Sequence, residues 1–403
     1  MKVDSDIVVI GAGPAGLSAA KTLEKEGVEY QLYAKEQHPC MDKPCGGFIP
    51  KRTVSEFELS NIKDAHTINS VEMRFPGVGI KQVAFEDSIG VNVSRGELGK
   101  KMLSNIGQCQ SRINLGYEVR MIERQDGYCI LKITVDQSDY EIASRLVIDA
   151  SGAYPVVVKS GLVRPKLTGR QMGYGQQYHF EKESNADNFK PVNRFYYGLE
   201  FSPGGYAWAY PRKRTAVIGS GGLLAQVRSD NKRVAGYIED FIQQSNIKEM
   251  LANATLVKKD AAPVPLGGRI TPSYANHILL AGDAAGHCSP ISGEGIHYSL
   301  MAGEIAGSVA AEAVKESDFS ARYLKEYEIR WKKAFGSDLK WGLWLQKRFT
   351  GSDGGESKSA FLESEKSCRV VAEMLTGRRE VFSAMKAIAP LYLASKVKSV
   401  FSR

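Results

Sequence analysis

Three glycines near the N-terminus have the spacing of a phosphate-binding loop. Gly11, Gly13 and Gly16 directly follow an apolar run, Asp6 to Ile10, and precede a helical pattern, Leu17 to Glu26. Gly11 permits a tight turn, Gly13 lets the backbone approach a pyrophosphate, and Gly16 allows the helix to pack closely on the strand. The free N–H groups and the positive partial charge at the start of the helix would then bind the phosphates. This context predicts a dinucleotide-binding βαβ unit at the start of the chain.

The residue that would bind the adenosine ribose is less clear from the sequence. In dinucleotide-binding folds an acidic side chain follows the glycine loop by about 20 positions. The second strand, Val28 to Ala34, ends at that place without an acidic residue. Two alternatives stay open: Glu36 takes the role, or the backbone and Lys35 hold the ribose.

A second glycine-rich segment lies far along the chain. It reads Gly282-Asp283-Ala284-Ala285-Gly286, with Gly293-Glu294-Gly295-Ile296 shortly afterwards, and it follows a short apolar run, His277 to Leu280. Together with the first loop, this segment indicates a flavin dinucleotide. Asp283 would hydrogen-bond the ribityl chain, and the amides near Gly295 and Ile296 would stabilise negative charge on the reduced ring.

Two further segments are expected near the same cofactor. Arg95-Gly96-Glu97-Leu98 is typical of a helix start, from which the Arg95 guanidinium could reach the cofactor phosphates. A buried run, Arg145 to Ile148, leads into Asp149-Ala150-Ser151-Gly152 and is expected to be another strand. The chain would then return to the cofactor sheet at three separated places, residues 6–34, 145–152 and 277–296.

These segments together resemble the flavoprotein group that includes para-hydroxybenzoate hydroxylase. Two other motifs are similar to those of the geranylgeranyl reductase family within that group. Lys43-Pro44-Cys45-Gly46-Gly47 is similar to its Pro-Cys-Gly loop, and Tyr206 to Pro211 is similar to its Y-x-W-x-F-P motif, with Tyr210 where Phe is usual. The resemblance spans residues 5 to about 310, and the chain length best suits the archaeal members that act on digeranylgeranylglycerophospholipids.

The resemblance implies FAD as the cofactor, an oxidoreductase activity and a set of flavin contacts. The activity would be reduction of the C=C bonds of geranylgeranyl lipids by hydride from N5 of reduced FAD, as in archaeal membrane lipid biosynthesis. The contacts would be Ala15 at the pyrophosphate, Cys45, Gly46 and Phe48 along the isoalloxazine, Arg95 and Val119 at the phosphate–adenine end, and Asp283, Gly295 and Ile296 at the ribityl chain and ring.

An aromatic strand is predicted to line the substrate channel. Tyr206, Trp208 and Tyr210 alternate along it, so their rings face one side, and Pro211 follows them. Such a wall would exclude water and stabilise positive charge that develops on an alkene. The alternative is ordinary sheet core with the same spacing. Cys45, Tyr206, an ordered water and the substrate's phosphate are open as proton donors, with Cys45 and Tyr206 as the candidate catalytic residues.

Three other functions fit parts of this pattern. A reductase of the same fold could act on menaquinone side chains or the phytyl precursor of chlorophyll. An aromatic or quinone-ring monooxygenase would use NAD(P)H and oxygen, but the Cys45 loop and the Tyr206–Pro211 motif argue against it. A lipid-carrying flavoprotein without catalysis would have a sealed flavin and no channel to N5.

The order of the segments predicts an α/β protein. A Rossmann-like FAD-binding domain would comprise residues 1–165 and 270–315, an inserted, mainly β substrate domain residues 166–269, and a helical C-terminal region residues 316–403. Short strands are also expected at Val71 to Phe75, Tyr117 to Glu123, Cys129 to Val135 and Tyr140 to Ile142.

The composition excludes several kinds of partner and site. Lys and Arg number 53 against 45 Asp and Glu, a net charge of +8, which is weak evidence for an anionic partner. The sequence has no dense tract of Lys and Arg, so a nucleic-acid partner is not expected. The 6 cysteines are too dispersed for a disulfide framework or a zinc site, and no metal is expected.

The expected location of the protein follows from segments that the sequence lacks. No apolar run reaches about 18 residues and no signal peptide is evident, so we expect a cytoplasmic protein, in peripheral contact with the inner face of the membrane. Trp331, Trp341 and Trp344 recur among lysines, a pattern that suits a membrane interface and equally a helix packed on the core. No second GxGxxG loop for a nicotinamide cofactor is present, which members of this flavoprotein group often lack. The expected partner is an external electron donor, with a ferredoxin and NAD(P)H as the open alternatives.

Overall fold

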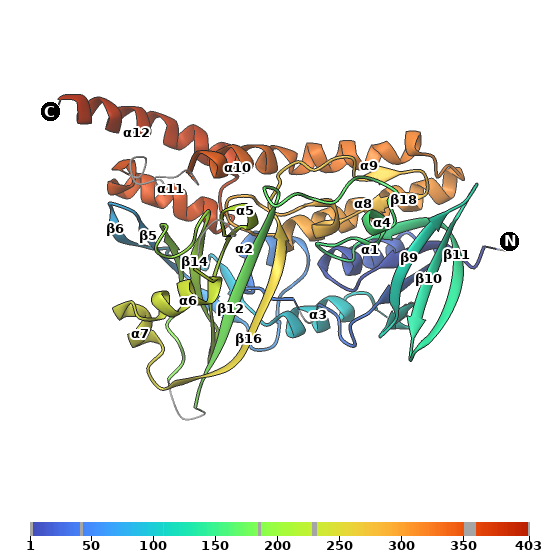
Figure 1. Ribbon diagram of the computed structural model, residues 1–403, viewed down its shortest axis with the longest axis horizontal. Helices are drawn as coiled ribbons and strands as arrows, with labels where there is room; N and C mark the ends of the chain where they lie inside the picture. Colours follow the sequence, from blue (N-terminus) through green and yellow to red (C-terminus); the bar gives the residue numbers. More distant parts are fainter. Residues whose placement is uncertain are drawn as a thin grey trace.

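The computed structural model describes residues 3–40, 43–107, 109–183, 187–227, 232–349 and 360–401. Two large sheets lie side by side, and a layer of long helices runs along both of them (Figure 1). The sheet at the right of Figure 1 contains the N-terminal strand, and the chain ends above the other sheet. This arrangement confirms the predicted α/β class with a helical C-terminal region.

The first sheet brings the three glycine-containing segments together. Its strand order is β17-β18-β11-β1-β2-β8, and β11, β1, β2, β8 and β18 run parallel. Ile10 lies beside Asp149, and Asp149 beside Leu280, so three strands end at the same edge. The segments that follow them, from Gly11, Ala150 and Ala281, therefore meet there, as the sequence predicted. The bounds are β1 Ser5–Ile10, β2 Tyr30–Ala34, β8 Ile113–Leu115, β11 Ser138–Asp149, β17 Tyr274–Ala275 and β18 Ile278–Leu280.

One strand is longer than the sequence pattern suggested. Tyr140 to Ile142 and Arg145 to Ile148 were expected as separate strands, but both belong to β11. Ala143 and Ser144 between them are small and buried, so they continue the ladder without a break. The first half of β11 pairs antiparallel with β10 (Cys129–Val135), which pairs with β9 (Glu118–Arg124), and the second half pairs with β1.

The second sheet has the order β16-β12-β15-β14-β13-β5-β6. Five of its strands come from the segment predicted as the substrate domain: β12 (Met172–Lys182), β13 (Val192–Tyr197), β14 (Gly205–Pro211), β15 (Thr215–Leu223) and β16 (Ala254–Pro265). β5 (Ser70–Phe75) and β6 (Gly79–Ala84) precede it, and β5 pairs parallel with β13. The chain thus enters this sheet first within residues 1–165, which we had assigned to the FAD-binding domain. A small sheet of β3 (Phe48–Pro50), β7 (Gly90–Asn92) and β4 (His66–Ile68) links the two parts.

Helices cover the first sheet and extend over the second. α1 (Pro14–Lys25) follows the glycine loop, and α8 (Ile296–Glu316) packs against it: a Cβ at Gly303 would lie 2.2 Å from the Ala15 oxygen. α9 (Ala321–Ala334) and α10 (Gly336–Phe349) continue this layer, and α11 (Glu365–Leu375) and α12 (Val381–Phe401) lie near β5, β6 and β14 (Figure 1). The remaining helices are α2 Lys51–Glu56, α3 Arg95–Ser104, α4 Val156–Lys159, α5 Leu224–Val227, α6 Val234–Ile242 and α7 Ser245–Met250, with short 3-10 turns at Cys109–Arg112, Gly282–Ala285 and Ala360–Glu363.

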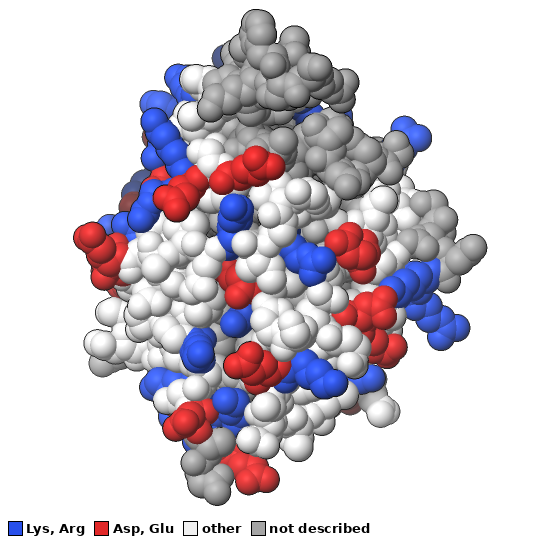
Figure 2. All heavy atoms as spheres, turned by 90° about the vertical axis from the view of Figure 1, so that its left-hand side faces the viewer, with Lys and Arg blue, Asp and Glu red and all other residues white. Residues whose placement is uncertain are grey.

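The tryptophans of the basic helical region have different environments. Trp331 is fully buried and belongs to the core, whereas Trp344 is 46% exposed on α10. None of the helices in the described ranges combines the length and apolarity that a bilayer crossing requires. Figure 2 shows the face at the α11–α12 end, where described Lys and Arg side chains alternate with Asp and Glu. The described part of this face therefore carries charges of both signs.

Candidate active site

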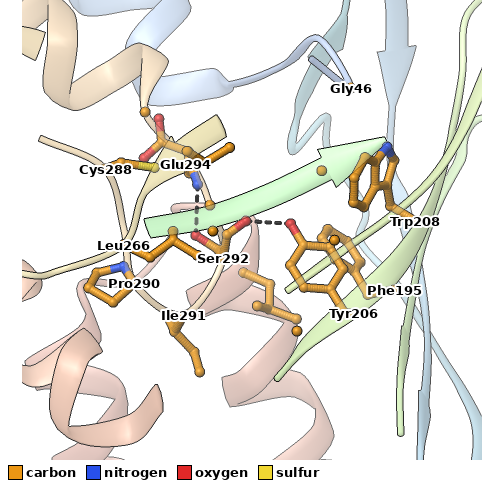
Figure 3. A pocket seen from close by; sticks show the side chains of 18 of the residues that line it. Gly46, Phe195, Tyr206, Trp208, Leu266, Cys288, Pro290, Ile291, Ser292 and Glu294 are labelled. Carbon is orange, nitrogen blue, oxygen red and sulfur yellow. Dashed lines mark hydrogen bonds between the residues drawn. The ribbon is translucent and has the colours of Figure 1, made fainter. Parts of the chain in front are cut away.

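A large cavity connects the cofactor loops with the second sheet. Its volume is about 610 Å³, within the range of about 300–1,000 Å³ that is typical of ligand sites. Three groups of residues line it: the glycine loop and the segments at the same sheet edge, the aromatic face of β13 and β14, and the helices α10 to α12. Figure 3 shows the part where the Cys288–Ile296 loop approaches the aromatic strand.

The glycine loop has the geometry of a phosphate cradle. Gly11 has φ +100°, and a Cβ there would lie 2.5 Å from the Ala150 oxygen, while one at Gly16 would lie 1.9 Å from the Gly11 oxygen. Both positions therefore exclude a side chain. Gly13 differs, because a Cβ there would meet nothing within 4 Å, and Gly13 and Ala15 line the cavity at the start of α1. This open space at a helix N-terminus fits a pyrophosphate.

Charged residues lie on the same side of the cavity. Arg95 begins α3 and lines the cavity, with its Nε donating to the Cys40 oxygen at 3.3 Å. Asp283 is 8% exposed and accepts a hydrogen bond from the Lys43 ammonium. An arginine that reaches the cradle and a nearly buried carboxylate at the edge of the sheet match what a dinucleotide requires, a cation for phosphate and an acceptor for hydroxyl groups.

The Pro-Cys-Gly loop packs directly on the aromatic strand. Cys45, Gly46 and Phe48 line the cavity, and a Cβ at Gly46 would lie 1.8 Å from the Tyr210 ring. Cys45 is a partly buried free thiol. Cys288 faces the same cavity, and burial raises the pKa of its thiol well above the ordinary value. Cys288 is therefore a neutral, packed thiol.

The three aromatic residues of β14 share one face, as their alternation predicted. Tyr206, Trp208 and Tyr210 all line the cavity, with the Tyr206 and Trp208 rings 5.8 Å apart and the Phe195 and Tyr206 rings 5.7 Å apart. The Tyr206 hydroxyl donates to the Ser292 carbonyl (Figure 3). Burial raises the pKa of both tyrosines, so their phenols stay neutral. Pro211 is buried behind this face and does not line the cavity; its carbonyl accepts from Asn92 Nδ2 at 2.6 Å.

Two proposed cofactor residues lie away from the cavity. Lys35 is exposed beyond the end of β2, and Val119 is buried in a hydrophobic cluster with Tyr33. Gly295, Ile296 and Arg95, by contrast, line the cavity with Asp283. Of the residues predicted to contact the cofactor, those at its adenine end are thus the least well represented in the lining of the cavity.

Sequence reasoning missed the wall formed by the C-terminal helices and the glycines that face Trp208. Met374 and Leu375 of α11 and Ile388 of α12 line the cavity. Across the sheet, a Cβ at Gly219 would lie 2.2 Å from the Trp208 ring, so this glycine makes room for the indole. The run of glycines in β15, Gly219, Gly221 and Gly222, is the signal that could have identified this close approach.

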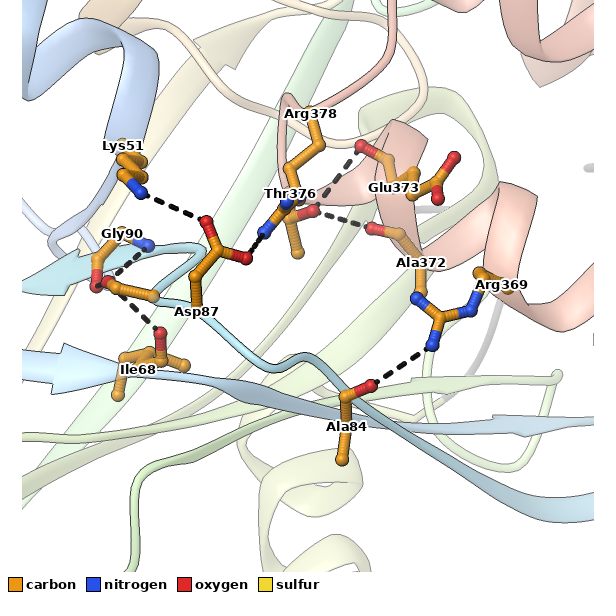
Figure 4. Close-up of polar contacts among 11 residues, drawn as sticks. Lys51, Ile68, Ala84, Asp87, Gly90, Arg369, Ala372, Glu373, Thr376 and Arg378 are labelled. Carbon is orange, nitrogen blue, oxygen red and sulfur yellow. Dashed lines mark hydrogen bonds and ion pairs between the residues drawn. The ribbon is translucent and has the colours of Figure 1, made fainter.

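The C-terminal wall is attached to the second sheet by polar contacts (Figure 4). Asp87 accepts hydrogen bonds from Lys51 Nζ at 2.9 Å and from Arg378 Nη1 at 2.7 Å, and Arg369 Nη2 of α11 donates to the Ala84 oxygen at 3.5 Å. The hydrogen bonds from Arg378 and Lys51 lower the pKa of Asp87 to about 2.

Replacing Asp87 by asparagine is expected to lower the melting temperature at neutral pH by a few degrees at most, because exposed ion pairs contribute little. The pKa of Asp87 is lower in the folded than in the unfolded protein, so its contribution is present above about pH 4 and is lost as the pH falls towards about 2. Thermal melts of Asp87→Asn and the wild type should therefore converge in this window. Asp126→Asn, at an exposed carboxylate in the β9–β10 turn, is the control, and an equal loss in both variants would contradict the role of the Arg378–Asp87–Lys51 contacts.

Comparison with known proteins agrees with this geometry. The profile of the family described as pyridine nucleotide-disulphide oxidoreductase matches residues 5–223. A digeranylgeranylglycerophospholipid reductase from Methanocaldococcus jannaschii is 30% identical over 330 residues, which cover 81% of this chain and 82% of the relative. Digeranylgeranylglycerophospholipid reductase 1 from Methanococcoides burtonii is 29% identical over 354 residues, which cover 87% of this chain and 85% of the relative.

Solved structures show the same fold at low sequence identity. A geranylgeranyl bacteriochlorophyll reductase-like protein from Thermoplasma acidophilum superposes with a TM-score of 0.82 and 19% identity, covering 99% of this chain and 98% of that one. A flavin-dependent brominase superposes with a TM-score of 0.74 and 16% identity, covering 98% of this chain and 99% of the brominase. The sequence relationships, on a flavoprotein fold with an intact phosphate cradle, establish that the chain belongs to the geranylgeranyl reductase family of FAD-dependent oxidoreductases.

Proposed function

We propose that the protein reduces the isoprenoid C=C bonds of geranylgeranyl lipids, as in archaeal membrane lipid biosynthesis. The cavity carries this proposal, because one continuous space of about 610 Å³ runs from the phosphate cradle to an apolar channel between β14 and the C-terminal helices. Reduced FAD, when bound, supplies hydride from N5. The names of the curated relatives support the same substrate class.

The residues of the channel would hold the alkene and keep water out. Phe195, Tyr206 and Trp208 offer ring faces on one side, and Met374 and Ile388 offer apolar side chains on the other. An unactivated alkene needs such a dry, well-aligned site, and aromatic faces stabilise positive charge that develops on carbon.

We assign the cofactor contacts from the same cavity. Gly13 and Ala15 would hold the pyrophosphate at the start of α1, Arg95 would approach the phosphate–adenine end, and Asp283 would bind the ribityl chain. Cys45, Gly46 and Phe48 would lie along the isoalloxazine, with the amides of Gly295 and Ile296 at its pyrimidine. Lys35 and Val119 stay as candidates for the adenine end.

The partners beyond the lipid are an electron donor and the membrane surface. We propose a ferredoxin or NAD(P)H as the external donor, and a cytoplasmic protein in peripheral contact with the inner face of the membrane. Trp344 and Arg348 support such contact, because both line the cavity and are exposed on α10, where a lipid tail would enter.

One assay tests the substrate class. Dithionite-reduced, FAD-loaded protein is mixed anaerobically with digeranylgeranylglyceryl phospholipid, and the product mass is measured. We expect a gain of two hydrogen atoms for each double bond reduced. Menaquinone and a phytyl precursor are tested in the same assay. Faster turnover of either one than of the phospholipid would identify the protein as one of the related reductases.

Two outcomes would contradict the proposal. Unchanged lipid together with oxygen-dependent NADPH consumption on an aromatic acid would indicate a monooxygenase. Lipid that binds tightly but is never reduced would indicate a carrier protein.

A further inference from the structure

Glu294 lies on the wall between the lipid cavity and a second, much smaller cavity. It belongs to the loop that leads into α8, and its backbone N–H donates to Ser292 Oγ at 3.3 Å (Figure 3). Its carboxylate accepts a hydrogen bond from the His297 N–H at 2.8 Å, and the residue lines both cavities. Glu294 is therefore reached from the substrate side and from a separate polar space.

The second cavity has the size and the lining for one ordered water. Its volume is about 20 Å³, above the roughly 10–15 Å³ that a water molecule requires. Arg52, Tyr298, Asp338 and Arg379 contribute to its wall. The Tyr298 hydroxyl donates to Asp338 Oδ2 at 3.2 Å, and the buried Arg52 Nε has no hydrogen-bond partner among the described residues. A water in this space would satisfy a polar group that is otherwise unpaired.

The pKa of the Glu294 carboxyl suits proton transfer near neutral pH. Burial raises the pKa of this carboxyl to about 7, while the His297 N–H and Arg52 act in the opposite direction and Asp338 adds to the rise. The titratable or charged groups that face it are Arg52 on α2, Tyr206 on β14, Cys288 in the preceding loop, His297 and Tyr298 on α8, Asp338 on α10 and Arg379 after α11. An acid with a pKa near the working pH transfers protons most effectively.

Three other acids of the cavity, Tyr206, Tyr210 and Cys288, are less suited to donate a proton. Burial raises the pKa of Tyr206, Tyr210 and Cys288 above their ordinary values, which already exceed neutrality. The Tyr206 hydroxyl also points its hydrogen at the Ser292 carbonyl. Glu294 is the cavity carboxyl that combines access to both spaces with a raised pKa.

We propose that Glu294 supplies the proton for alkene reduction and is reprotonated through the small cavity beside Arg52 and Asp338. This inference rests on the proposed function. As the C=C π bond breaks, one carbon gains hydride from reduced FAD and the other gains the Glu294 proton, so the lipid gains two hydrogen atoms. Glu294 is left as a carboxylate, and the water in the small cavity returns a proton to it from the solvent.

Glu294→Gln tests this role, because glutamine keeps the shape and the acceptor for the His297 N–H but cannot supply the proton. In anaerobic stopped-flow experiments, oxidation of reduced flavin by digeranylgeranylglyceryl phospholipid should slow by about 100-fold or more, the usual size of a general-acid contribution. The wild-type rate should fall as the pH rises above about 7, because the acid form is lost, whereas the variant rate should stay flat. Formate should restore part of the rate to Glu294→Ala, which has room for a small acid.

Controls separate this proposal from the proposed function. Glu304→Gln changes the same residue type on the exposed side of α8 and should leave rate and pH profile unchanged. Infrared titration should reveal a protonated carboxyl in the wild type that ionises between about pH 6 and about pH 8 and is missing in Glu294→Gln. If the wild type reduces the lipid and Glu294→Gln reduces it equally fast, the proton route is overturned but the proposed function stands. A wild type that leaves every double bond intact overturns both proposals.

Discussion

Gly13→Asp is expected to weaken FAD binding by about three orders of magnitude while the protein stays folded. Gly13 has φ −81° and a Cβ there would meet nothing within 4 Å, so the backbone and the packing accept a side chain. The aspartate would project into the phosphate cradle at the start of α1. Repulsion between two unit charges about 4 Å apart costs about 4 kcal/mol at an effective dielectric constant of about 20, which corresponds to binding weaker by about three orders of magnitude.

Titration of FAD into apoprotein, followed by flavin fluorescence, measures this loss. The melting temperature of the Gly13→Asp apoprotein should stay close to that of the wild-type apoprotein. Gly169→Asp is a matched control, because a Cβ at Gly169 makes only ordinary contacts and the residue does not line the cavity. Retention of FAD by Gly13→Asp with wild-type affinity would show that the cofactor phosphates lie elsewhere.

Ala262→Trp is expected to slow lipid reduction without removing the flavin. Ala262 lies on β16 opposite Gly175, and both residues line the cavity. An indole placed there would occupy space that the prenyl chain needs. Forcing a larger group into filled space costs about 1–3 kcal/mol, which would lower kcat/KM for the lipid by roughly 5- to 150-fold.

Ala261→Trp is the matched control for this substitution. Ala261 is the preceding residue on the same strand, is exposed and points to the opposite face. The two variants should bind FAD equally and have similar flavin spectra, but only Ala262→Trp should lose turnover. Equal lipid turnover in the two variants would mean that the prenyl chain does not pass along β16.

The positions of the glycine loop and of the aromatic face of β14 could be predicted from the sequence because their signals are local. Gly11, Gly13 and Gly16 act within a single strand–turn–helix unit, and the alternation along β14 follows from strand geometry alone. The return of the chain at residues 145–152 and 277–296 was also predictable, since a run of small residues that contains a glycine follows each buried strand. These features depend on few long-range contacts.

The remaining features depend on packing between distant parts of the chain. Nothing local indicates that β5 pairs with β13 or that Met374 and Ile388 line the same cavity as the glycine loop. Glu294 was visible as part of a motif, but its raised pKa arises from burial and from Asp338, and the helices α8 and α9 separate these two residues in the sequence. Ala143 and Ser144 show the same limit on a smaller scale, because only the pairing of β10 with β11 reveals that they continue a strand.

The cavity combines residues at the start of α1 with residues of α11 and α12, and this has a consequence for synthesis on the ribosome. The phosphate cradle is encoded by residues 11–16, whereas its far wall requires residues up to Tyr392. A nascent chain can therefore form the first βαβ unit early, but the lipid-facing surface of β14 stays uncovered until α11 and α12 have been translated. Premature termination within α11 or α12 would leave this aromatic surface open to water and to association with other chains.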